Sequence, residues 1–99
     1  MRILEQAKQL MRVAHMSLRT EKAYVNWMEE LFRFEKERCG RWIHPANMGS
    51  EEVNRFLTHL AVDRNVAAST QNQALSAFRS LFRKVLGRDD IVLNAVPWF

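Results

Sequence analysis

The side chains of this sequence that could do chemistry are few and scattered. The three histidines, His15, His44 and His59, fall on different predicted elements, and no pair has the spacing of a metal site. The sequence also lacks the glycine motifs that bind phosphate groups or dinucleotides. We therefore expect no metal, no cofactor and no catalytic residue in this chain.

Two other side chains are candidate nucleophiles. Cys39 would need a neighbouring base, and nothing in the sequence supplies one, so we interpret it as a helix-end residue. Tyr24, the single tyrosine, lies on an apolar stripe and is expected to pack in the core. The adjacent Asp89 and Asp90 are interpreted as solvated carboxylates.

The strongest pattern is a basic helical face without acids. The stretch from Val66 to Arg88 contains four basic residues and no acidic one. On a helical wheel of about 100° per residue, its polar side chains fall in two neighbouring arcs opposite the apolar face. The first arc holds Asn72, Ser76, Arg79 and Arg83, and the second holds Gln73, Ser80 and Lys84. Amides, guanidinium groups and hydroxyls contact bases and phosphates. The face is either a nucleic-acid contact or an ordinary solvated surface, and the lack of carboxylates favours the first.

A weaker version of this pattern occurs earlier in the chain. Four polar residues share a narrow arc opposite Tyr24: Arg19, Lys22, Asn26 and Arg33. Glutamates lie close to the arc toward its C-terminal half. If this face meets DNA, we expect its N-terminal half to do so, around Arg19, Thr20 and Lys22.

Four helices must position these residues. The predicted helices cover 2–14, then 18–38 with Ser17 as cap, then a segment that starts at Ser50, and last a helix capped by Ser69 or Thr70 that ends near Leu86. Gly40 and Gly87 follow the second and fourth helices as C-caps. No segment reads as a strand. The stripe spacing predicts that these residues are buried: Trp27, Leu31, Phe56, Leu60, Leu75, Phe78 and Phe82.

Length and composition limit the possible fold and the kind of partner. Ninety-nine residues with 47% hydrophobic and 26% charged side chains fit one globular all-α domain, a compact four-helix bundle whose tryptophans and phenylalanines supply most of the core. We assign residues 1–88 to it and 89–99 to an apolar tail or severed interdomain linker. The net charge of +4, with eleven arginines among the fifteen basic residues, favours an anionic partner. No signal peptide or membrane span is apparent, so we expect the cytoplasm.

Two stretches resemble a known family. Residues 17–27, SLRTEKAYVNW, resemble the opening of the N-terminal core-binding (SAM-like) domain of tyrosine recombinases, the phage integrase family. Residues 56–77, FLTHLAVDRNVAASTQNQALSA, closely resemble the integron integrases within it, and Met48-Gly49 and RKVLG at 83–87 also fit. The resemblance covers roughly residues 3–87.

The resemblance implies a domain that clamps one side of the recombination-site duplex, with its second and fourth helices in the major groove. It places Arg19, Thr20 and Lys22 on the DNA backbone and residues 69–72 at a helix N-terminus, where free amides favour phosphate. The residues expected at the DNA are Arg19, Thr20, Lys22, Asn26, Ser69, Thr70, Gln71, Asn72, Gln73, Ser76, Arg79, Arg83 and Lys84.

The family's catalytic residues belong to a C-terminal domain that this sequence does not include. The chain alone is therefore expected not to cut or rejoin DNA, and Tyr24 does not match the family's nucleophile. We interpret the chain as the DNA-binding module of an integron-type site-specific recombinase. We expect the isolated module to be a monomer and the full-length recombinase to form a tetramer on DNA. Double-stranded sites and folded single-stranded hairpins both remain open as partners. The alternative is a helical protein–protein interaction bundle without a DNA role, in which the apolar stripe and Trp98-Phe99 dock a partner.

Overall fold

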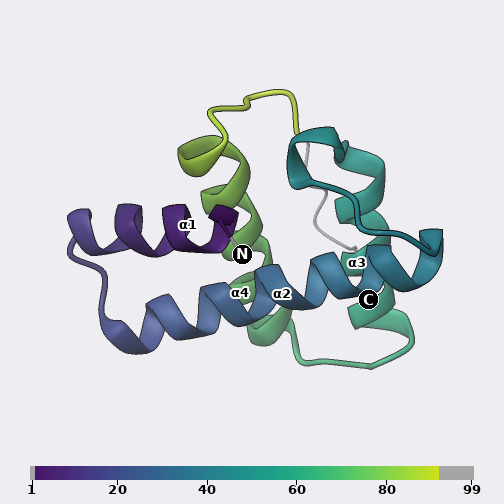
Figure 1. Cartoon of the computed structure of the whole chain (residues 1–99). Coiled ribbons are helices and arrows are strands. Elements are labelled where there is room, and N and C mark those ends of the chain that lie inside the picture. The colour runs from purple at the N-terminus through teal and green to yellow at the C-terminus, as the bar shows by residue number, and fades with distance from the viewer. Residues whose placement is uncertain (1, 92–99) are drawn as a thin grey trace.

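The computed structural model describes residues 2–91 and shows helices throughout, with no strand among these residues. The helices are α1 (Arg2–Val13), α2 (Leu18–Cys39), α3 (Ser50–Val62) and α4 (Ala68–Arg79), with a short 3-10 helix at Pro45–Asn47. A π-helical turn, Ser80–Val85, continues α4. Helix α1 runs beside α2, α4 crosses behind both, and α3 lies at the far end of α2 (Figure 1). The predicted all-α class is confirmed.

The ends of α2 follow from local chemistry. Ser17 is the N-cap, and its Oγ accepts a hydrogen bond from the backbone N–H of Thr20 at 3.1 Å. Gly40 closes the helix in the left-handed conformation, with φ of 75°, and its N–H donates to the carbonyl of Lys36. Both predicted caps are confirmed.

The predicted start of α4 is wrong. The N-cap is Ala67, which makes no side-chain cap hydrogen bond, so Ser69 and Thr70 lie inside the first turn instead of capping it. The reason is tertiary, because the buried amide of Gln71 in that turn donates to the carbonyl of Leu57 on α3 at 2.8 Å. This buried bond ties the first turn of α4 to α3.

The end of α4 is close to the prediction but has a different geometry. The cap residue is Leu86, whose N–H donates to the carbonyl of Leu81 five residues earlier. Gly87 is not the cap but follows it with φ of 62°, and the N–H of Arg88 returns to the carbonyl of Phe82 at 2.7 Å. The wider π-helical turn shifts the side chains after Arg79 relative to a regular α-helix.

The core is close to the predicted set, with one correction. Phe56, Phe78 and Phe82 are fully buried, and so are Leu31 and Leu60. Trp27 is buried with 7% of its surface exposed, whereas Leu75 is only half-buried at the edge of the cluster. Aromatic residues contribute less than expected, because Trp42 is 40% exposed and leucines and methionines fill much of the interior. Trp98 and Phe99 lie outside the described residues.

The chain after α4 packs on the body through Arg88. Its guanidinium donates to the carbonyls of Pro45, Ala46 and Met48 and pairs with Asp90 at 2.6 Å. Ile91 is buried in the core. The packed part of the chain therefore extends past residue 88. Within residues 2–91, no helix is long and apolar enough to cross a membrane.

Candidate nucleic-acid interface

The basic residues fall into two groups by their pairing. One group makes ion pairs with carboxylates: Lys8, Arg12, Arg38, Arg55, Arg64 and Arg88. The other group makes no ion pair with any residue from 2 to 91: Arg2, Arg19, Lys22, Arg33, Lys36, Arg41, Arg79, Arg83 and Lys84. Only the second group is free to neutralise an external anion.

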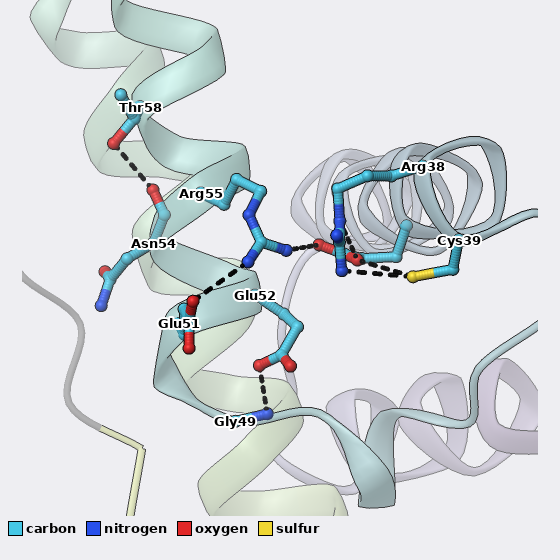
Figure 2. Close-up of polar contacts among 9 residues, drawn as sticks. Arg38, Cys39, Gly49, Glu51, Glu52, Asn54, Arg55 and Thr58 are labelled. Atoms are coloured by element: carbon cyan, nitrogen blue, oxygen red, sulfur yellow. Dashed lines mark hydrogen bonds and ion pairs between the residues drawn. The ribbon is translucent and has the colours of Figure 1, made fainter.

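The paired cations concentrate where α2 meets α3. Glu35 is fully buried there and is held by Arg38 at 3.0 Å and by Arg55 at 3.4 Å, while Arg55 also reaches Glu51 (Figure 2). The hydrogen bond with Glu35 raises the pKa of Arg38 above its ordinary value. Because a buried carboxylate left without its partners is strongly destabilising, these guanidinium groups belong to the fold. Arg64 is likewise paired, with Glu30 at 3.0 Å.

The free cations of α4 gather around a hollow of about 280 Å³ between α4 and the start of α2, here termed the α2–α4 groove. Its lining is Met16, Tyr24, Ser76, Arg79, Ser80, Arg83 and Lys84. Three cations and three hydroxyls thus face one hollow, and its lining contains no carboxylate. Such a lining suits a phosphate group, which accepts hydrogen bonds from both kinds of donor.

Tyr24 was expected in the core, and the structure gives it a position at the edge. Its ring is half-buried against the core and also forms one wall of the α2–α4 groove. Ser80 and Met16 line the groove too. The sequence pattern placed Ser80 on the polar face of the last predicted helix, but it did not assign Met16 or Tyr24 to DNA, because their place depends on how α2 packs against α4.

The predicted contact residues of α2 divide between two sides of the helix. Lys22 and Asn26 line a separate shallow hollow, together with Glu21 and Glu29, and do not line the α2–α4 groove. Arg19 is exposed. Thr20 is half-buried and accepts a hydrogen bond from the hydroxyl of Ser17 at 2.8 Å. The structure therefore does not bring the Lys22 side of α2 together with Arg79.

The predicted residues at the start of α4 differ in access. Ser69 and Asn72 are exposed and Thr70 is half-buried. Gln71 is 4% exposed, so the expectation that its side chain faces DNA is wrong. Its side-chain amide instead donates a hydrogen bond to the backbone carbonyl of Leu57. Gln73 is exposed but accepts a hydrogen bond from the indole N–H of Trp27 at 3.1 Å.

The other polar candidates have local roles. His44 caps the 3-10 helix through Nδ1, and His59 lies 2.8 Å from Asp63. The thiol of Cys39 contacts Arg38 and the carboxylate of Glu35. In the part of the chain that the structure describes, no group of three or more histidine, cysteine or acidic side chains could hold a metal ion.

Known proteins share this sequence pattern over nearly its whole length. Residues 3–90 match the family model described as phage integrase, N-terminal SAM-like domain. Two proteins named integrase/recombinase, one from Escherichia coli and one from Pseudomonas aeruginosa, are each 42% identical over 97 residues. The alignment covers 98% of this chain and 26% of each relative, so the chain spans about a quarter of their length. The chain therefore belongs to the family of phage integrase N-terminal SAM-like domains.

Proposed function

We propose that this chain is the DNA-binding module of a site-specific tyrosine recombinase of the integron type. One observation carries the proposal: the unpaired cations of α4 line the α2–α4 groove together with hydroxyls and without a carboxylate. Family membership supports DNA as the anion, since integrases and recombinases act on DNA. The run ASTQNQAL at 68–75 supports the integron type.

In this proposal α4 lies along the duplex and α2 supports one edge of the contact. Arg79, Arg83 and Lys84 neutralise phosphates, and the release of the counterions bound to those phosphates supplies much of the affinity. Arg79 also reads a base edge, because a guanidinium can pair with guanine through two hydrogen bonds. The start of α2 contributes Arg19 and Thr20.

The proposal also covers the oligomeric state, location and activity of the module. The chain binds recombination-site DNA as a monomer, in the cytoplasm, and does not itself cut or rejoin strands. The parent protein supplies the chemistry and assembles as a tetramer on DNA. A module that holds only part of such a clamp is expected to bind near the non-specific range, with a dissociation constant of about 10⁻⁴–10⁻⁶ M at physiological salt.

A salt titration of duplex binding tests the proposal. Wild type, Arg79→Ala and Arg83→Ala are compared with Arg64→Ala, a matched control that removes an arginine already paired with Glu30. The groove variants should bind more weakly and reduce the slope of log affinity against log salt by about one each. Arg64→Ala should leave the slope unchanged. Equal losses in all three variants would mean diffuse attraction and would contradict the groove.

A further inference from the structure

A second and larger hollow lies on a different part of the molecule. It measures about 680 Å³ and is bounded by the start of α1, the second half of α2 and the loop before the 3-10 helix. We term it the α1–α2 groove. Its lining is Arg2, Ile3, Leu4, Glu29, Phe32, Arg33, Lys36, Trp42 and His44. None of these residues lines the α2–α4 groove, so the two hollows are separate sites.

The floor and one wall of the α1–α2 groove are apolar. Ile3, Leu4 and Phe32 form the floor and are nearly buried. Trp42 forms a wall, with its ring edge-to-face against Phe32 at 5.3 Å between centroids. It remains 40% exposed although it borders buried apolar side chains. A partially uncovered tryptophan over an apolar floor is the kind of surface that anchors protein interfaces.

The rim of the same groove is cationic. Arg2, Arg33 and Lys36 are exposed and make no ion pair within residues 2–91, and Glu29 is the single acidic residue of the lining. The Nδ1 atom of His44 accepts a hydrogen bond from the N–H of Ala46 at 3.0 Å, which leaves Nε2 as the donor of the ring. The rim therefore offers hydrogen-bond donors and positive charge to an acidic partner.

We infer that the α1–α2 groove docks an acidic amphipathic helix of a protein partner. The apolar stripe of such a helix would cover the floor beside Trp42, and carboxylates along its flanks would pair with Arg33 and Lys36. A nucleobase fits less well, because its polar edges would lose water over a floor of Ile3, Leu4 and Phe32 side chains that offers no hydrogen bond. The apolar floor and cationic rim thus favour protein over nucleic acid.

The docking site does not compete with the proposed DNA site, because the two grooves have no lining residue in common. The module would hold DNA through α4 and a protein through the start of α1 and the end of α2. This surface also gives the protein–protein alternative a location. It makes protein binding an addition to the proposed DNA contact instead of a replacement for it.

The experiment uses the full chain and a fluorescent 16-residue helical peptide, with leucine and phenylalanine at positions i, i+3, i+4 and i+7 and glutamate at the flanking positions. Fluorescence anisotropy should show saturable binding. A peptide with lysine in place of glutamate and one with serine in place of leucine and phenylalanine should bind at least tenfold more weakly. Binding of the lysine peptide with equal affinity would contradict the cationic rim.

Variants of the protein locate the site. Trp42→Ala should weaken peptide binding about tenfold, as expected when an interface tryptophan is truncated, and Trp42→Phe should restore most of the affinity. Lys36→Glu should weaken binding several-fold, while Lys84→Glu, the same charge reversal in the α2–α4 groove, should leave it unchanged. Circular dichroism melting confirms that each variant is folded.

Three outcomes would overturn the inference. The first is a peptide affinity that Trp42→Ala and Lys36→Glu leave unchanged, or no peptide binding at all. The second is binding of oligo(dT) that these two variants abolish, since the occupant would then be single-stranded nucleic acid. The third is concentration-dependent self-association, measured by sedimentation, that Trp42→Ala removes, since the occupant would then be a second copy of the chain.

Discussion

The two grooves of this domain have the same sign of charge but different surfaces between the cations. In the α2–α4 groove, Arg79 and its neighbours alternate with the hydroxyls of Tyr24 and Ser76. In the α1–α2 groove, Arg33 and Lys36 surround an apolar floor and Trp42. The first suits a small, strongly hydrated anion such as a phosphate, and the second suits an apolar surface with acidic flanks. Positive charge alone therefore does not specify the partner, and the neutral atoms beside the charge decide it.

Both grooves depend on one core, and the largest expected effect comes from breaking it. Phe78 is fully buried and packs edge-on against Phe56, with 5.7 Å between ring centroids. Phe78→Ala should lower the free energy of unfolding by about 3–5 kcal/mol, through lost burial and the cavity left behind. Urea unfolding measures this loss. The control Val62→Ala, at a 69% exposed position, should be nearly neutral; an unchanged Phe78→Ala protein would show that the core is assigned wrongly.

Gln71 separates the role of α4 in the fold from its role at the DNA. Gln71→Ala leaves the carbonyl of Leu57 without its buried donor and should cost about 1–3 kcal/mol of stability. Duplex affinity of the folded variant should be unchanged. The exposed neighbour Asn72→Ala should lose little stability. A Gln71→Ala protein that melts normally but binds DNA poorly would show that the Gln71 side chain contacts DNA after all.

Lys22 and Arg79 test whether the Lys22 side of α2 contributes as much to DNA binding as the α2–α4 groove does. Lys22 lies in a hollow that also contains Glu21 and Glu29, whereas Arg79 lies in the α2–α4 groove, which has no acid in its lining. Lys22→Ala should therefore change the salt slope of duplex binding by less than Arg79→Ala does, and only Arg79→Ala should reduce preference for the recombination site. Titrations on specific and scrambled duplexes measure both. A larger effect at Lys22 would place the DNA across the opposite side of α2.

The smallest expected effect concerns the contact that holds the chain after α4. The hydrogen bond from Arg88 holds the pKa of Asp90 below its ordinary value. The native carboxylate is thus favoured in the charged form, so the pair stabilises the fold at neutral pH and loses this contribution as the pH falls below about 4. Asp90→Asn should lower the melting temperature slightly at pH 7. The difference should shrink at the most acidic pH at which the wild type is folded; a constant difference would exclude this ion pair as its cause.

The elements that were predictable from sequence are those determined by local chemistry. Ser17 and Gly40 end α2 through contacts within four residues, and periodicity within single helices identified most of the core. The start of α4 was not predictable in this way, because it depends on the bond between Gln71 and Leu57, which are fourteen residues apart. The partial exposure of Leu75 and Trp42 also depends on how separate helices meet.

The candidate site was predictable for α4 and not for α2. Arg79 and Arg83 share a face within one helix, so a helical wheel was enough to group them. Whether Lys22 lies at the same groove as Arg79 and Arg83 depends on which side of α2 meets α4. That side is known only once the helices are packed, when Tyr24 lines the α2–α4 groove and Lys22 lines a different hollow. The ion pair of Arg64 with Glu30, by contrast, joins α2 to the end of α3 and leaves no trace in the local sequence.

The π-helical turn at Ser80–Val85 has a consequence for charge density. In a regular α-helix, Lys84 would point about 140° away from Arg79, but here both line the same groove with Arg83. Three like charges therefore border one groove and repel one another in the free domain. Bound anions relieve that repulsion, so inorganic phosphate should stabilise the empty domain and should do so less in Lys84→Ala. The cations that the π-helical turn brings to the groove would then raise the local potential that attracts a polyanion.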